Sequence, residues 1–139
     1  MPDKETLKRA QRDKRQGKAA STQAGEFVRE EIHHVREGKH GARSAKQAIA
    51  IGLSKARRAG VNLPARAGTR DKAEEAEAGR KPSAKRARAV RGALKKESRS
   101  SASKTALSRQ AHKSAARRSA ASRSAAAKKA AATRRRNAR

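Results

Sequence analysis

Most of the large apolar residues of this chain lie between residues 22 and 64, where they fall at helical spacing. Phe27, Val28, Ile32 and Val35 share one face of a first predicted helix, and charged residues occupy the opposite face. Gly38 is expected to end this helix, because glycine readily adopts the left-handed conformation found just after a helix. An apolar face of this kind needs a partner to cover it.

A second helix, beginning at Ser44, is the predicted partner. Ser44 and Gln47 have the spacing of a capping box, in which the two side chains bond to the free amides of the first turn. Gly60 fits the C-terminal cap and Pro64 prevents continuation. Small residues recur every four positions and predict the close approach of another helix: Ala48, Gly52 and Ala56. Residues 22–64 are therefore predicted to form a helical hairpin.

The remaining segments give weaker patterns. Residues 3–16 indicate a short solvated helix that Asp3 can cap, with Leu7 and Ala10 as its only apolar contacts. Residues 65–97 are predicted to be a linker with weak helices, and residues 98–139 a basic tail. We therefore expect a mostly α protein with four segments: 1–21, a basic helix and linker; 22–64, the hairpin; 65–97; and 98–139, largely disordered and rich in Lys, Arg, Ala and Ser.

The charge of the tail points to a partner. After Glu97 the chain has no acidic residue, and its last 42 residues hold nine Arg and four Lys, a net charge of +13. The whole chain carries +27. Such a segment has little to bury and repels itself, so it is expected to become compact only against a polyanion such as nucleic acid.

Composition also argues against several classes of protein. There is no Cys, so disulfides and thiolate metal sites are excluded. No apolar run is long enough to cross a membrane, and the charged N-terminus is unlike a signal peptide, so we expect a cytoplasmic protein that contacts no membrane. No nucleophile motif, phosphate-binding glycine loop or paired carboxylates occur, which predicts no catalytic residues, no cofactor and no enzyme activity.

The histidines have a spacing that raises the question of a metal site. Glu30 and Glu31 stand three residues before His33 and His34, the Glu-x-x-His spacing of di-iron bundles, and His40 follows. Such bundles need a second helix of this kind, and the chain has none. We therefore favour helical ion pairs between Glu30 and His34 and between His33 and Glu37, with no metal site.

Two groups of cations are the candidate nucleic-acid-binding residues. They are Arg43, Lys46, Lys55, Arg57 and Arg58 on an outer face of the hairpin, and Lys104, Arg109, Lys113, Arg117, Arg118, Arg123, Lys128, Lys129, Arg134, Arg135 and Arg136 in the tail. Phe27 is the one aromatic residue and belongs to the apolar stripe, whereas readers of single strands and RNA usually stack bases on aromatic rings.

This combination favours double-stranded DNA, held largely without regard to sequence by a histone-like protein of the nucleoid. The hairpin is a candidate surface for a homodimer. Two alternatives stay open. The chain could be an RNA- or ribosome-associated basic protein, or a protein-interaction module whose tail only localises it.

The segment FVREEIHHVREGKHGARSAKQAIAIGLSKARRAG resembles a family of small basic bacterial proteins known only as a domain of unknown function. This resemblance covers about residues 20–64 and implies a bacterial source, but it implies no activity and no site residues. The tail is similar in composition to the C-terminal tails of linker histones and of histone-like bacterial proteins. It differs from them in having more Arg than Lys and no Pro.

Overall fold

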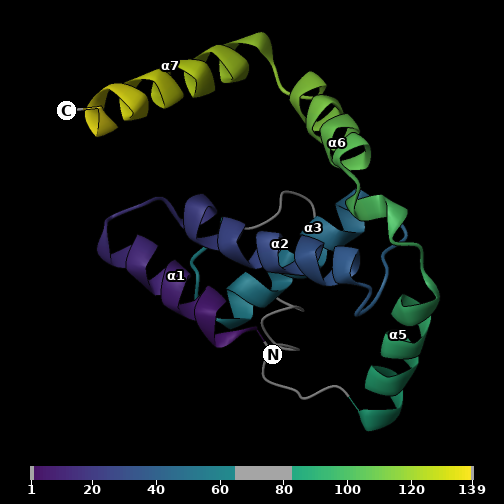
Figure 1. Cartoon of the computed structure of the whole chain (residues 1–139). Helices are drawn as coiled ribbons and strands as arrows, with labels where there is room; N and C mark the ends of the chain where they lie inside the picture. The colour runs from purple at the N-terminus through teal and green to yellow at the C-terminus, as the bar shows by residue number, and fades with distance from the viewer. Residues whose placement is uncertain (1, 65–82, 139) are drawn as a thin grey trace. The chain divides into compact units, whose positions relative to one another are not determined.

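The computed structural model describes residues 2–64 and 83–138, and its regular elements in these ranges are all helices (Figure 1). The mostly α fold class is therefore confirmed. A first compact unit, Met1–Ser103, contains α1 (Lys4–Arg15), α2 (Ala20–Glu37), α3 (Ala45–Arg58), α5 (Ala84–Lys96) and the 3₁₀ turn η1 (Ser100–Ala102). A second unit, Lys104–Arg139, contains α6 (Lys104–Ala116) and α7 (Ala120–Asn137). Residues 65–82 of the predicted linker with weak helices lie outside the described residues.

The predicted hairpin is confirmed as α2 packed against α3. Phe27 and Val35 of α2 are fully buried, and the repeated small residues of α3 face this helix: Ala48, Gly52 and Ala56 are all buried. A Cβ atom placed on Gly52 would lie 2.6 Å from the Cα atom of Val28. The helix backbones therefore meet at a point where only glycine fits.

Replacing Gly52 with alanine is expected to lower the free energy of unfolding by roughly 1–3 kcal/mol, because the added methyl group forces the two backbones apart. The matched control is Gly25→Ala in α2, where a Cβ atom would meet no atom within 4 Å. There the better helix propensity of alanine should raise stability by up to about 1 kcal/mol. Thermal or urea unfolding of the two variants measures the difference. Equal stabilities would contradict the close crossing.

The N-terminal helix packs more closely than the sequence predicts. Thr6, Ala10 and Asp13 of α1 are buried, and α1 lies against α2 (Figure 1). The helix predicted at residues 3–16 is therefore confirmed, but its solvated character is not, because one face of α1 is buried. Small and polar residues occupy the buried face, so the helix shows no apolar stripe. All three helices contribute to one core cluster: Ala10, Ala24, Phe27, Ala56 and Val61, with Leu7, Ala20, Leu53 and Leu63 packed around it.

The helix ends follow the predicted signals in most details. Gly38 and Gly60 both have positive φ angles, 78° and 83°, and Val61 after Gly60 is buried. The Ser44 Oγ atom accepts a hydrogen bond from the amide of Gln47 at 3.2 Å. The return bond of the capping box is shifted by one residue, since Gln47 Oε1 accepts from the amide of Arg43 at 2.7 Å.

Residues 98–103, predicted to lack tertiary contacts, instead pack on the hairpin. Ala102 of η1 is fully buried beside Val35, Ala42 and Ala48. The Arg36 guanidinium donates a hydrogen bond to the carbonyl oxygen of Ala102 at 2.9 Å. The amide of Ala42 donates a hydrogen bond to the carbonyl oxygen of Ser98 at 3.1 Å. The contact uses a small residue and backbone groups, which hydrophobic patterning does not reveal. Residues 98–103 therefore belong to the first unit, and the second unit starts at Lys104.

Beyond residue 103 the chain has helices without a core. Neither α6 nor α7 has a buried residue. The expected lack of apolar packing is thus confirmed for the described part of the tail. Its helices agree with the high alanine content and the absence of Gly and Pro, which favour helix even without tertiary support.

Candidate functional site

The acidic side chains of the described residues are all used within the chain. Each lies within ion-pair distance of a basic side chain: Asp3 with His34, Glu5 with Lys8, Asp13 with Lys18, Glu26 with Arg9, Glu30 and Glu31 with Lys55, Glu37 with Lys39, and Glu97 with Arg43. The other described lysines and arginines have no such partner among these acids. They are therefore the groups available to an external anion.

Four of the five cations predicted on the outer face of the hairpin are exposed: Arg43, Lys46, Arg57 and Arg58. Arg43 lies 3.8 Å from a carboxylate oxygen of Glu97, yet 83% of its side chain is exposed. Arg43 and Lys46 also line a shallow surface pocket of about 360 Å³ at the N-terminus of α3. These four residues form the hairpin part of the basic surface.

Lys55, which the sequence places on that outer face, is instead paired with two carboxylates inside the chain. Its Nζ atom lies 2.7 Å from Glu31 Oε2 and 3.4 Å from Glu30 Oε1, and only 20% of its side chain is exposed. Burial by itself would lower the pKa of Lys55, but the contacts with Glu31 and Glu30 outweigh this and raise it above its usual value. Lys55 is an internal counter-ion.

The predicted tail cations are all exposed, on α6, on α7 and in the turn between them. They are Lys104, Arg109, Lys113, Arg117, Arg118, Arg123, Lys128, Lys129, Arg134, Arg135 and Arg136. At 100° per residue, Arg123, Lys128 and Lys129 point in three different directions around α7. The tail therefore offers positive charge on every side of this helix rather than along one stripe.

The structure shows a further group of exposed cations that the sequence analysis did not name as candidate nucleic-acid-binding residues. Helix α5 carries Lys85, Arg86, Arg88, Arg91, Lys95 and Lys96, all exposed. Their density along the chain, with no acidic residue inside the helix, is the sequence signal that could have identified them. We add α5 to the basic surface of the first unit.

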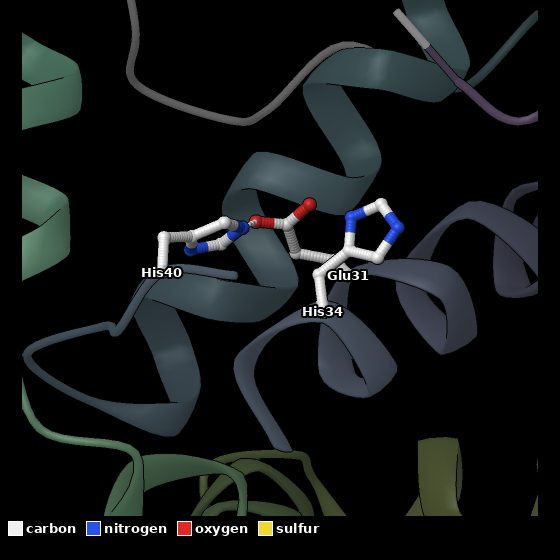
Figure 2. A group of neighbouring side chains, drawn as sticks. All are labelled: Glu31, His34 and His40. Carbon is white, nitrogen blue, oxygen red and sulfur yellow. Dashed lines mark ion pairs between the residues drawn. The ribbon is translucent and has the colours of Figure 1, made fainter. Parts of the chain in front are cut away.

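A separate cluster of charges lies inside the three-helix core, around Glu31. This carboxylate is 0% exposed, and its Oε1 atom lies 3.1 Å from His40 Nε2 (Figure 2). Lys55 approaches the other oxygen. Neither contact has the angular geometry of a hydrogen bond, so both oxygens of this buried group lack hydrogen-bond partners in the described structure.

His34 connects this cluster to the N-terminus of α1. Its Nε2 atom lies 3.3 Å from Asp3 Oδ2, and the amide of Asp3 donates to Glu30 Oε2 at 3.1 Å. The favoured ion pair between Glu30 and His34 is therefore replaced by one between Asp3 and His34. The sequence also predicted an ion pair between His33 and Glu37, but Glu37 pairs with Lys39 in the structure. Asp3 makes no capping hydrogen bond with its side chain.

Residues 4–67 match the model of a protein family described as a family of unknown function (DUF6496). The match begins at the first residue of α1 and includes α2 and α3, so it covers all three packed helices. No curated protein and no solved structure matches the chain. The three-helix unit is thus similar to a domain family of unknown function. Within the described residues, no helix is long and apolar enough to cross a membrane.

Proposed function

We propose that this protein binds double-stranded DNA without catalysis and largely without regard to sequence, as a histone-like protein of the bacterial nucleoid in the cytoplasm. The observation that carries the proposal is the set of exposed tail cations, which have no ion-pair partner among the described acidic residues. A positively charged chain of this kind gains affinity for DNA by releasing the counterions condensed on the phosphates.

The arrangement of charge around α7 supports a bridging role. Because its cations point in several directions, one helix can contact phosphates of two duplexes at the same time. Arginine exceeds lysine in the tail, and arginine side chains can also enter a narrow minor groove. These contacts read backbone and shape rather than base identity, so little sequence preference is expected.

In this proposal the three-helix domain is a folded part of the protein that contributes to DNA binding alongside the tail. Its exposed cations, Arg43, Lys46, Arg57 and Arg58, add phosphate contacts without providing a recognition element. Its acidic residues are neutralised inside the chain and therefore offer little repulsion to DNA. We keep the hairpin as a candidate homodimer surface.

The test is a salt titration of binding to two unrelated duplexes of equal length and to a structured RNA of the same number of phosphates. We expect the two duplexes to bind with the same affinity within about threefold and the same slope of log K against log salt. The RNA should bind more weakly. Tighter binding to RNA would replace this proposal with an RNA-associated role, and a strong preference for one duplex would contradict sequence independence.

A further inference from the structure

The buried cluster around Glu31 has the composition of a metal site, although the sequence pattern alone disfavours one. In the sequence, only one helix carries the Glu-x-x-His spacing. The fold adds His40 from the loop after α2, so that Glu31, His34 and His40 each offer a ligand atom, all within 4.8 Å of one another. Figure 2 shows the Glu31 carboxylate between the two imidazole rings.

Both ring nitrogens of His40 lie close to oxygen atoms. Its Nδ1 atom lies 3.0 Å from the carbonyl oxygen of Gly41, and its Nε2 atom lies 3.1 Å from Glu31 Oε1. A neutral imidazole has only one N–H group. With that group on Nδ1 and directed at the Gly41 carbonyl, the lone pair of Nε2 and the unpartnered Glu31 Oε1 are both left to bind a metal ion.

Both rings are also held as metal-binding histidines usually are. Such a histidine donates its second ring N–H to a carboxylate or a backbone carbonyl, which fixes the ring. Asp3 lies at this position for His34, and the Gly41 carbonyl does so for His40. The 3.1 Å distance between His40 Nε2 and Glu31 Oε1 is close to the edge of about 3.3 Å expected for a tetrahedron with bonds of about 2.0–2.1 Å.

The carboxylates at the centre of the cluster favour a cation. Glu30 and Glu31 are both buried and share the single ammonium group of Lys55. His34 also lines a surface pocket of about 270 Å³, together with Asp3 and Glu30.

We propose that Glu31, His34 and His40 bind one divalent transition-metal ion, for which Zn²⁺ is the best match. Two imidazoles and one carboxylate suit Zn²⁺, with water as the fourth ligand. A second group, Asp3, Glu30 and His34, lies beside it. It is the weaker choice because Glu30 already accepts a hydrogen bond from the Asp3 amide, and because the Asp3 side chain is largely exposed. The bound ion would fasten the loop after α2 to the helix itself, independently of any role in DNA binding.

The experiment uses the full chain without a histidine tag, stripped of metal, and titrated with Zn²⁺ in competition with a chromophoric chelator. The chain has four histidines, which provides matched controls. His34→Gln and His40→Gln remove ligands, whereas His33→Gln and His112→Gln alter exposed histidines outside the cluster. We expect one Zn²⁺ per chain, unchanged affinity in the two controls, and a loss of at least about tenfold in each ligand variant.

Asp3→Asn keeps all three ligands and removes only the carboxylate behind His34, on a side chain that is largely exposed. It should weaken Zn²⁺ binding by about 10–100-fold while the domain stays folded. Nitrogen NMR of the imidazoles adds a structural readout: Zn²⁺ should shift the signals of His34 and His40 and leave those of His33 and His112 in place. No stoichiometric binding, or equal effects of all four histidine variants, would overturn the proposal.

Discussion

Deleting residues 104–139 is expected to weaken binding to duplex DNA by roughly a hundredfold or more at about 0.1 M salt. The deleted segment holds twelve of the thirteen cations that follow Glu97. Each neutralised phosphate contributes roughly −0.9 to the slope of log K against log salt, so the tail can contribute at most about −11. Three phosphate contacts would already change K by roughly 2.7 log units per tenfold change in salt.

The deletion is placed after Ser103 because residues 98–103 pack on the hairpin. Removing them would confound lost charge with damage to the domain. Salt titrations of the full and shortened chains on the same duplex measure both affinity and slope, and unfolding curves check that the domain is intact.

A chain whose residues 104–139 are shuffled is the matched control, since it keeps length, composition and charge. Sequence-independent binding predicts that the shuffled chain retains both affinity and slope. A shortened chain that keeps full affinity would place DNA binding in the three-helix domain. If the shuffled chain lost all its affinity for DNA, the order of residues in α6 and α7 would matter. Counterion release alone does not explain such a dependence.

The sequence predicts the hairpin because its signals are local or periodic. Phe27 and Val35 stand at helical spacing, Ser44 begins a helix, and Gly52 lies within that helix where two backbones meet. Each of these features acts through residues a few positions apart or through one helix face. No further information is needed to place α2 against α3.

The packing of α1 and of η1 is not visible in such patterns. Thr6 and Asp13 are buried although they are polar, and Ala102 is buried although alanine is abundant throughout the tail. Their burial depends on partners distant in the chain. A hydrophobic stripe therefore identifies the largest interface and misses those built from small and polar residues.

In the candidate site, too, some features could be predicted from the sequence and others depend on contacts between residues that are distant in the chain. Exposure of the tail cations follows from a composition with nothing to bury. The role of Lys55 does not, because on its own helix it resembles one more exposed cation beside Arg57 and Arg58. Its partners, Glu30 and Glu31, are 25 and 24 positions earlier in the sequence, on α2. Only the crossing of α2 and α3 turns it into a buried counter-ion.

Replacing Lys55 with methionine is expected to cause a larger loss of stability than Gly52→Ala, about 3–5 kcal/mol. The reason is that two buried carboxylates would lose their shared ammonium ion, and breaking one side of a buried ion pair leaves charge without compensation. Natural domains are stable by only about 5–15 kcal/mol, so the variant should be marginally folded. Denaturant unfolding at neutral pH measures the effect.

The pH of that measurement follows from the direction of the pKa shift. The pKa of Lys55 is raised in the folded chain, so the stability from its charge is complete below the unfolded value of roughly 10.4. It is lost only as the pH rises through the higher folded-state pKa. At neutral pH the parent chain therefore retains the whole contribution that the variant lacks.

Two comparisons separate this mechanism from a general effect of losing a lysine. Lys46→Met changes an exposed lysine on the same helix and should alter stability by less than about 0.5 kcal/mol. Adding Glu30→Gln and Glu31→Gln to Lys55→Met removes the uncompensated charges and should restore part of the lost stability, since a buried ion pair can be replaced by neutral groups at little cost. If Lys55→Met is as mild as Lys46→Met, the two carboxylates do not depend on Lys55, and their charge must be balanced by the histidines or by the proposed metal ion instead.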